Sequence, residues 1–254
     1  MKKSLAVTGK GGCGKTTLAA LMVRALVEAG HTPVLAVDAD PNTNLDAALG
    51  VKIEQTVGDV REEGLQKIES LPAGLTRTEF LRLRTQEALV EADGFDLLAM
   101  GRPEGPGCYC FANSILRGAV DQISANYACT VIDCEAGLEH LSRRTTRNLD
   151  DLVVLADPSV RSLETAARIV KLAATLKVQI KNCHLVLSRV RNGVPQLLQE
   201  AARERGLEIE GIVPDDEEIR SLDEQGKPLI KVSSENAVFL AARQLLETIG
   251  WQTK

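Results

Sequence analysis

The feature of this sequence that most restricts how the chain can fold is a glycine-rich run near its start, GKGGCGKTT at residues 9–17. The run matches the pattern G-x-x-x-x-G-K-[ST], and it lies between a predicted strand at residues 4–8 and a predicted helix at residues 15–28. Glycines in such a loop let consecutive backbone N–H groups turn inward around phosphate oxygens, and the helix N-terminus adds the positive end of its dipole. The run therefore predicts a phosphate-binding loop in an α/β protein.

The side chains of this loop have distinct chemical uses. Lys15 supplies a positive charge that serves both binding and catalysis, Thr16 offers a hydroxyl to Mg²⁺, and Thr17 is placed to reach the α-phosphate of a nucleotide. Cys13 is interpreted as a small apolar filler rather than a ligand. The glycines expected to bind phosphate through the backbone are Gly9, Gly11, Gly12 and Gly14.

Short apolar, partly β-branched runs alternate with longer segments of helical periodicity, which is typical of parallel strands joined by crossover helices. Strands are predicted at residues 4–8, 33–38, 95–100, 128–133, 152–156, 184–188 and 208–213. Helices are predicted at residues 15–28, 79–92, 112–126, 162–176, 193–205 and 234–249. We expect a three-layer α/β fold in which a mostly parallel central sheet of about seven to eight strands has helices on both faces.

Residues 51–107 interrupt this alternation, since only one strand is evident there and the composition turns polar. We interpret the segment as an insertion, locally helical and on the surface, whose run RPEGPG at residues 102–107 forms a loop. No repeat, low-complexity tract or linker divides the 254 residues, so we expect a single domain over residues 1–254.

The composition disfavours several classes of protein. With 30 Lys+Arg against 35 Asp+Glu and only 4 Phe, 2 Tyr and 1 Trp, the sequence has neither a basic block nor stacking platforms, so no nucleic-acid partner is expected. The N-terminus reaches glycine too soon for a signal peptide, and no stretch of about 18 apolar residues could span a bilayer. The six cysteines do not indicate a disulfide framework, because three lie in or beside apolar runs. We expect a cytoplasmic protein with no membrane partner.

Acidic residues end two of the predicted strands. Asp38 and Asp40 follow the second strand at i and i+2, where the carboxyl edge of the sheet would turn both carboxylates toward the phosphate loop, and they suit Mg²⁺ and water. Asp133 closes a mostly apolar strand, the arrangement that holds the water shell of Mg²⁺ in phosphoryl-transfer proteins. Gly137 then allows the backbone to approach the γ-phosphate.

Lys10 adds a second lysine to the loop, and the resulting KGGCGKTT resembles the deviant Walker A loop of the MinD/ParA/nitrogenase-iron-protein class of dimeric ATPases. The resemblance implies the P-loop NTPase fold, ATP and ADP as ligands, and a homodimer in which Lys10 crosses to the partner's nucleotide, so that hydrolysis requires dimerisation. It also implies that Asp40 orients or activates the attacking water. Asp38 and Asp133 would then lie in the outer shell of Mg²⁺.

The adenine pocket of this class usually has Asn at the end of a late strand, in an Asn-Lys/Arg-x-Arg run. The corresponding run here is SRVR at residues 188–191, so Ser188 is the candidate base contact in place of Asn. Pro214 lies in a segment that resembles the second adenine-flanking segment of the class. The prediction that the bound nucleotide is ATP therefore rests on the resemblance more than on these residues.

A Cys-x-Cys pair, Cys108 and Cys110, follows the loop at the end of the insertion. In an extended segment the two Cα atoms lie about 7 Å apart, too far for an easy disulfide. Two thiolates are half of a tetrahedral Zn²⁺ site or of a square-planar Ni²⁺ site, and a twofold axis between two chains would complete either one. Lys10 predicts the same dimer, although two loop thiols without a metal remain the alternative.

The Cys-Tyr-Cys motif and three others resemble those of the CooC-type nickel chaperone ATPases. This resemblance implies a dimeric metallochaperone that supports nickel insertion into a client enzyme, carbon monoxide dehydrogenase or acetyl-CoA synthase. ATP would bring two protomers together, and hydrolysis would loosen the dimer so that the metal can pass on. The other motifs are Asn113-Ser114-x-Leu116, Asp133-x-x-Ala136-Gly137-x-Glu139-His140-Leu141 and Asp157-Pro158-Ser159-x-Arg161-Ser162.

Two other functions have to be weighed. A positioning ATPase that binds a membrane would need a basic amphipathic C-terminal helix, but residues 236–251 carry one Arg and one Glu and are interpreted as a helix docked on the fold. Relatives that share a [4Fe-4S] cluster between two chains for electron transfer have a second cysteine after the switch II segment. Residues 135–148 contain none.

Overall fold

The computed structural model describes residues 3–66, 74–102, 118, 120–137, 148–175 and 179–252. Within them, eight strands form one sheet in the order β3-β4-β2-β5-β1-β6-β7-β8, and neighbours run parallel except β3 against β4. The predicted mostly parallel sheet is confirmed. The strands are β1 (Lys3–Gly9), β2 (Val34–Asp38), β3 (Val90–Glu91), β4 (Phe95–Ala99), β5 (Cys129–Asp133), β6 (Asn148–Ala156), β7 (Gln179–Val190) and β8 (Ile209–Pro214).

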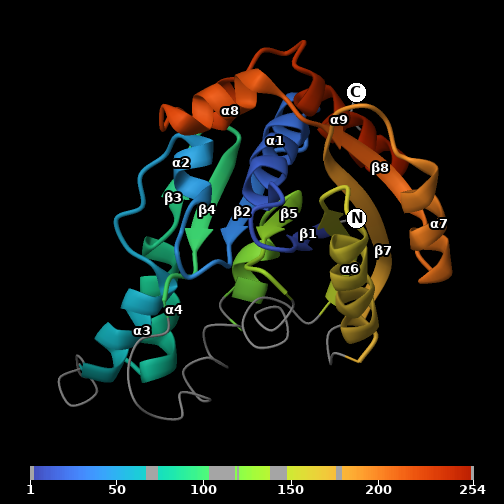
Figure 1. Ribbon diagram of the computed structural model, residues 1–254. Helices are drawn as coiled ribbons and strands as arrows, with labels where there is room; N and C mark the ends of the chain where they lie inside the picture. Colours follow the sequence, from blue (N-terminus) through green and yellow to red (C-terminus); the bar gives the residue numbers. More distant parts are fainter. Residues whose placement is uncertain are drawn as a thin grey trace.

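Helices cover both faces of this sheet (Figure 1). They are α1 (Lys15–Glu28), α2 (Leu45–Leu49), α3 (Val57–Gln66), α4 (Arg77–Glu87), α6 (Val160–Ala173), α7 (Gln196–Glu204), α8 (Glu217–Glu224) and α9 (Ala237–Thr248), with a 3-10 turn η2 (Leu229–Lys231). On one face lie α1, α2, α8, η2 and α9, and on the other lie α3, α4, α6 and α7. The expected three-layer α/β fold is thus confirmed.

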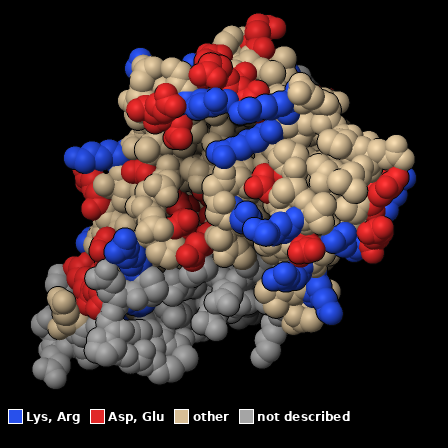
Figure 2. Space-filling model, in the orientation of Figure 1, with Lys and Arg blue, Asp and Glu red and all other residues tan. Residues whose placement is uncertain are grey.

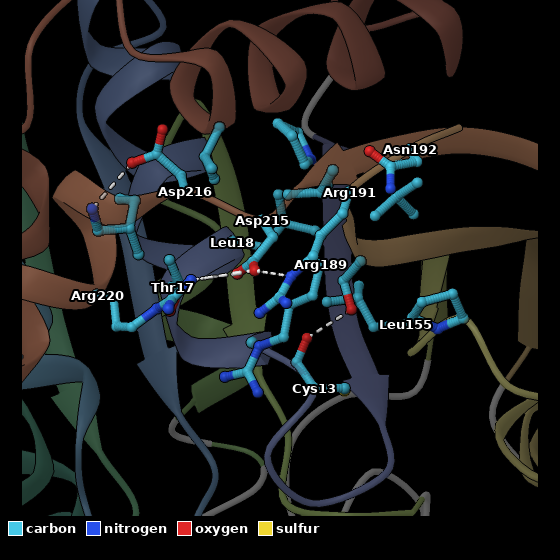
Figure 3. A pocket seen from close by; sticks show the side chains of 18 of the residues that line it. Cys13, Thr17, Leu18, Leu155, Arg189, Arg191, Asn192, Asp215, Asp216 and Arg220 are labelled. Carbon is cyan, nitrogen blue, oxygen red and sulfur yellow. Dashed lines mark hydrogen bonds and ion pairs between the residues drawn. The ribbon is translucent and has the colours of Figure 1, made fainter. Parts of the chain in front are cut away.

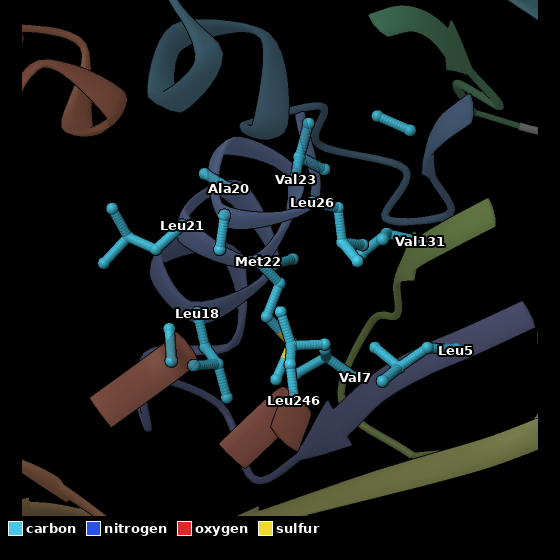
Figure 4. Close-up of a cluster of buried hydrophobic side chains, with 14 of the residues drawn as sticks. Leu5, Val7, Leu18, Ala20, Leu21, Met22, Val23, Leu26, Val131 and Leu246 are labelled. Atoms are coloured by element: carbon cyan, nitrogen blue, oxygen red, sulfur yellow. The ribbon is translucent and has the colours of Figure 1, made fainter. Parts of the chain in front are cut away.

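The two faces bury separate hydrophobic cores, because successive residues of a strand point to opposite sides. In β1, Leu5 and Val7 join the core that includes α1 and α9, whereas Ala6 joins the core that includes α6 and α7. Figure 4 shows the first of these cores, with Met22 of α1 and Leu246 of α9 near the β1 side chains. Burial on both faces explains why the strands read as continuous apolar runs.

The chain differs from the sequence-based expectation around residues 79–92. Helix α4 ends at Glu87, and Val90 and Glu91 instead form β3, which pairs with β4 at one edge of the sheet. Gly94, with a left-handed φ of 81°, lies in the short turn between the two strands. The helix ends before its predicted last residue because Val90 and Glu91 pair with β4 instead.

The segment interpreted as an insertion is helical, as expected, but it is not confined to the surface. Val57 and Val60 of α3 and Leu81 of α4 are fully or almost fully buried in the core beneath β2 and β4. Both helices therefore contribute to the core, although α4 buries only Leu81 and Thr85 and otherwise lies on the surface, as expected. Of the helix predicted at residues 112–126, residues 118 and 120–124 are helical, and residues 112–117 and 119 lie outside the described part of the chain.

The C-terminal segment forms a docked helix, as interpreted from its sequence. Helix α9 buries Phe239, Ala242 and Leu246 against the sheet and α1. Among the described residues, no helix has both the length and the apolar character needed to cross a membrane.

Candidate functional site

The phosphate loop joins β1 to α1 at the carboxyl edge of the sheet (Figure 1). Gly9 approaches β6 so closely that a Cβ atom would lie 2.3 Å from the carbonyl oxygen of Leu155. Gly11 and Gly12 are exposed in the loop, and Gly14 precedes α1 with a left-handed φ of 91° and no side-chain cap. The N–H groups in the first turn of α1 therefore remain available to bind an anion such as phosphate.

The two lysines of the loop have different environments. Lys15 is buried, and its ammonium donates a hydrogen bond to the carbonyl oxygen of Lys10 over 3.3 Å. The Lys10 ammonium lies 4.0 Å from Asp157 Oδ2, and 46% of the Lys10 side chain is exposed. Such a long, exposed contact contributes little to stability. Lys15 is thus fixed inside the loop, whereas Lys10 is held loosely.

Asp133 ends β5 beside the first turn of α1. Its Oδ2 accepts a hydrogen bond from Thr16 Oγ1 over 2.6 Å, and its buried Oδ1 has no hydrogen-bond partner within the described residues. Asp38 is its register partner on β2. Burial raises the pKa of Asp133 to about 7, and the negative charge of Asp38 adds to the effect. The site therefore buries negative charge without a cation of its own to offset it fully.

Asp38 is fully buried, and the backbone of the next loop occupies its carboxylate. Oδ1 accepts the N–H of Asp40 over 3.0 Å, and Oδ2 accepts the N–H groups of Asn44 and Leu45, each over 2.9 Å. Burial still raises the pKa of Asp38 to about 6. The strand-based expectation that Asp38 and Asp40 project together does not apply, because β2 ends at Asp38 and the chain turns there. Asp38 therefore holds residues 40–45 through hydrogen bonds, and its carboxylate does not face the phosphate loop as a free ligand.

Asp40 is partly exposed in that turn. Its Oδ1 accepts two hydrogen bonds from Asn42, one from the backbone N–H over 2.8 Å and one from Nδ2 over 3.1 Å. Thr43 has a φ of 45°, which is strained for a β-branched residue. Strain of this kind is concentrated at functional loops, which agrees with a role for this turn.

Gly137 follows β5 with a φ of 104°. Its carbonyl oxygen accepts a hydrogen bond from Thr8 Oγ1 over 2.8 Å. The backbone after β5 is thus held against the end of β1, and the approach of Gly137 to a γ-phosphate stays a prediction.

A cavity of about 760 Å³ opens beside the phosphate loop (Figure 3). The loop and α1 contribute Cys13, Gly14 and Thr17 to its lining, and the ends of β7 and β8 contribute Ser188 and Pro214. A volume of this size is typical of small-molecule sites. Both predicted base contacts therefore lie in one cavity that is continuous with the phosphate loop.

The Ser188 hydroxyl makes a hydrogen bond to the phosphate loop. Its Oγ donates a hydrogen bond to the carbonyl oxygen of Cys13 over 2.8 Å, and the residue is 2% exposed. Ser188 thus fastens the phosphate loop to β7 in addition to lining the cavity, and its contact with a base stays a prediction. Cys13 is also buried, and burial raises the pKa of its thiol, in agreement with a filler role.

Charged residues at the mouth of the cavity were not singled out from the sequence. Asp215 accepts hydrogen bonds from Arg191 Nε over 2.6 Å and Arg220 Nη2 over 3.0 Å, and the first of these chiefly lowers the pKa of Asp215. Arg189, with a φ of 57°, lies beside Cys13 in Figure 3. Figure 2 shows acidic and basic side chains interspersed over α8. The signal available in the sequence was the opposite charge of the residues that follow the two strands, Arg191 after β7 and Asp215 after β8.

The oxygen atoms beside the phosphate loop are suitable ligands for a magnesium ion. Mg²⁺ prefers oxygen ligands, and the Thr16 hydroxyl and the Asp133 carboxylate supply them side by side. The unpartnered buried Oδ1 of Asp133 is an acceptor that a cation or its bound water would satisfy. The raised pKa of Asp133 has a related cause, the burial of a carboxylate whose charge Lys15 offsets only in part.

The predicted metal thiols, Cys108 and Cys110, lie outside the described residues, as do Glu139 and His140. Within the ranges that the structure describes, no group of three or more His, Cys, Asp or Glu could hold a metal ion. The cysteines that are described form no disulfide, as expected from their apolar surroundings, and are Cys13, Cys129, Cys134 and Cys183.

The fold and the site together define a class of protein. A parallel sheet with a phosphate loop after its central strand β1, an aspartate at the end of β5 and an adjoining nucleoside-sized cavity are the parts of a P-loop ATPase. A model of the family described as the CobQ/CobB/MinD/ParA nucleotide binding domain matches residues 5–229. The chain belongs to this family, so its predicted place in the MinD/ParA class is confirmed.

The matches to individual proteins cover nearly the whole chain. It is 45% identical over 247 residues to an uncharacterized ATP-binding protein of Methanocaldococcus jannaschii, covering 96% of this chain and 97% of that protein. It is 34% identical over 263 residues to the carbon monoxide dehydrogenase accessory protein CooC of Rhodospirillum rubrum, covering 97% of each. A ParA family ATPase from Chlorobium tepidum TLS has the same fold, with a TM-score of 0.72 at 20% identity over 96% of this chain and 98% of that one.

Proposed function

We propose that this chain is an ATP-hydrolysing metallochaperone that works as a homodimer. Its cargo is Ni²⁺ or Zn²⁺, bound by Cys108 and Cys110 of two chains, and its client is carbon monoxide dehydrogenase or acetyl-CoA synthase. The observation that carries this proposal is the similarity, over 97% of the chain, to a carbon monoxide dehydrogenase accessory protein, in a sequence that has a Cys-x-Cys motif.

Nucleotide binding follows from the loop and the adjoining cavity. The phosphates of ATP lie against Lys15 and the N–H groups at the start of α1, and the nucleoside fills the cavity beside Thr17, with its base near Pro214. Thr16 would hold Mg²⁺ and Asp133 its water shell, and the ion would supply positive charge against the phosphate oxygens. Ser188 keeps the loop in place from behind.

Hydrolysis uses groups on both sides of the phosphates. Asp40 orients the attacking water and accepts its proton, and the backbone of Gly137 approaches the γ-phosphate. Lys10 reaches the nucleotide of the partner subunit, for which it has to leave Asp157. The half-exposed Lys10 side chain and its long 4.0 Å contact with Asp157 support this step, because little is lost when the contact breaks.

The cargo site needs the same dimer. Two thiolates from each chain give a four-sulfur set, which suits Zn²⁺ in a tetrahedral geometry and Ni²⁺ in a square-planar one. ATP closes the dimer and assembles the thiolates, and hydrolysis separates them so that the metal passes to the client enzyme.

The decisive experiment measures metal content and oligomeric state together, with ATP, with ADP and without nucleotide. We expect nickel or zinc to co-purify with an ATP-dependent dimer and to be lost from Cys108→Ala/Cys110→Ala. Cys183→Ala, which changes a half-buried cysteine of β7, is the matched control and keeps the metal. A double variant with the nickel content of the wild type would refute the metal assignment.

The roles of Lys10 and Asp40 are tested by turnover. Lys10→Ala should bind nucleotide but neither dimerise nor hydrolyse ATP, and a fully active monomeric variant would contradict its role in the partner's site. Asp40→Ala should accumulate as an ATP-bound dimer in size-exclusion chromatography. Rapid hydrolysis by that variant would move the water-orienting role to another residue.

A further inference from the structure

Strand β7 carries one extra residue where it passes the phosphate loop. Between Leu187 and Val190 the chain advances three residues, whereas their pairing partners on β8 are only two residues apart. Both side chains lie in the core that includes α6 and α7, although a spacing of three would put them on opposite faces of a regular strand. Ser188 and Arg189 therefore form a β-bulge, a feature that redirects side chains next to functional sites.

The bulge turns Arg189 away from that core and into the cavity beside the phosphate loop. Arg189 has a left-handed φ of 57°, is exposed, and lines the cavity. Such a backbone conformation is unfavourable for a residue with a Cβ atom, and it persists only where the surroundings enforce it. The hydrogen bond from Ser188 to the carbonyl oxygen of Cys13 is one contact that does so. The strain thus holds a guanidinium group at the cavity.

The charge of Arg189 is available to a ligand. Of the three arginines that line the cavity, Arg191 and Arg220 donate hydrogen bonds to Asp215, whereas Arg189 has no ion pair within the described residues. A guanidinium group without a carboxylate partner in a nucleotide-sized cavity is suited to bind phosphate, because its donors form a planar fork that matches phosphate oxygens.

This charge lies beside the phosphate loop. Figure 3 shows Arg189 next to Cys13, which directly precedes the first turn of α1. Burial raises the pKa of the Cys13 thiol, and the positive charges of Lys15 and Arg189 both oppose that rise. Thr17 lines the same cavity from α1. Arg189 therefore places a positive charge where the loop meets the cavity.

We propose that Arg189 binds the α-phosphate of the nucleotide. With the β- and γ-phosphates against Lys15 and the base near Pro214, the α-phosphate joins the two parts at the junction of loop and cavity, beside Thr17. Arg189 supplies the cation there, since Lys15 is buried deeper in the loop. This inference rests on the proposed placement of the nucleotide and is independent of the cysteines.

Nucleotide affinity tests the contact. ADP and the non-hydrolysable analogue AMPPNP share the α-phosphate, so Arg189→Ala should weaken the binding of both about tenfold in calorimetric titration. Arg189→Lys keeps the charge without the fork and should fall between Arg189→Ala and the wild type. The loss should be equal for ADP and inosine diphosphate, because the base is not involved, and a loss that depends on the base would overturn the assignment.

Steady-state kinetics give a second readout. The α-phosphate contact is the same in the bound substrate and in the transition state, so Arg189→Ala should raise the KM for ATP while kcat stays within about twofold. A lower kcat with an unchanged KM would contradict the role. Arg203→Ala is the matched control and should behave as the wild type, since Arg203 is exposed on α7 and has no ion pair in the described part of the chain.

Arg189→Gly separates binding from folding. Glycine adopts a left-handed φ without strain, so the nucleotide-free variant should unfold at a urea concentration no lower than the wild type, yet bind ADP about tenfold more weakly. An arginine that only supported the fold would give the opposite pair of results, a lower urea midpoint and an unchanged affinity.

A further variant distinguishes a failure of this inference from a failure of the proposed placement. Lys15→Ala should lose ADP binding. If it binds ADP as tightly as the wild type, the nucleotide lies elsewhere, and the placement fails together with the role of Arg189. If Lys15→Ala loses binding but Arg189→Ala binds both nucleotides as the wild type does, or loses affinity for AMPPNP alone, the α-phosphate contact is wrong and the placement stands.

Discussion

Gly9 and Gly11 are close neighbours in the phosphate loop, yet the structure requires glycine at only one of them. A Cβ atom on Gly9 would lie 2.3 Å from a β6 carbonyl oxygen, whereas a Cβ atom on Gly11 would meet nothing within 4 Å. Gly9→Ala should therefore lower the free energy of unfolding by about 2 kcal/mol or more, and Gly11→Ala by less than about 0.5 kcal/mol. Urea denaturation of both variants checks this difference, and equal losses would contradict it.

Ser188 connects β7 to the phosphate loop, so its removal should affect both stability and nucleotide binding. Ser188→Ala leaves the buried carbonyl oxygen of Cys13 without this donor, and we expect a loss of about 1–2 kcal/mol in unfolding free energy together with weaker ATP binding. Calorimetric titration with ATP measures the second effect. Ser234→Ala, at an exposed position, is the control and should match the wild type.

The sequence predicts the loop residues well, because their chemistry is local. Placing Asp133 beside Thr16 needed only the rule that parallel strands present their carboxyl ends at one edge. The direction of the Asp38 carboxylate could not be predicted, since it depends on where β2 ends and how the backbone turns. The contact between Asn42 and Arg102 was also out of reach, because it joins residues 60 positions apart through tertiary packing.

At the scale of elements, α9 contributes one large side chain whose burial can be tested directly. Phe239 is 0% exposed, and the Arg24 guanidinium of α1 lies 4.0 Å from the centre of its ring. Phe239→Ala should lower the unfolding free energy by about 3–5 kcal/mol. Leu240→Ala, one residue along and 44% exposed, is the matched control with an expected loss of at most about 1 kcal/mol. Similar losses in thermal or urea unfolding would argue against the docking of α9.

Elements with strong periodicity were predicted and marginal ones were not. The bounds of α1 agree with the sequence-based prediction, and every predicted strand is present. Helix α2 was missed because it has five residues, and β3 because it has two. Helix α8 is also absent from the prediction and buries no side chain completely. A helix-start signal was nevertheless present in the sequence, since Asp216 caps its first turn and Glu217 and Glu218 follow.

At the scale of the whole molecule, a charged network joins three strands to the C-terminal segment, at the edge of the sheet opposite the phosphate loop. His184 contacts Asp151 Oδ1 through Nε2 at 3.0 Å and Glu210 Oε2 through Nδ1 at 2.7 Å. Trp251 and Asn182 donate to Asp151 as well. Because both ring nitrogens face carboxylates, the imidazolium form is favoured, and the hydrogen bond to Asp151 chiefly raises the pKa of His184.

This network predicts a pH dependence of stability. The folded pKa of His184 lies above its unfolded value of about 6.5, so the stabilisation is complete below about pH 6.5 and is lost as the pH rises through the folded pKa. His184→Gln should therefore be less stable than the wild type by about 1–2 kcal/mol at about pH 6. The difference should narrow by about pH 9. Urea unfolding across this range measures it, and a gap that widens with pH would contradict the assignment.

The position of β1 in the middle of the sheet also affects the order in which the protein can be made. This strand leaves the ribosome well before its two neighbours in the sheet, β5 and β6, which begin at Cys129 and Asn148. The phosphate loop at its end is braced by β6 and, through Ser188, by β7. Parallel pairing over such distances is slow. A nascent chain therefore carries its phosphate-loop sequence long before the strands that support the loop, β6 and β7, have been translated.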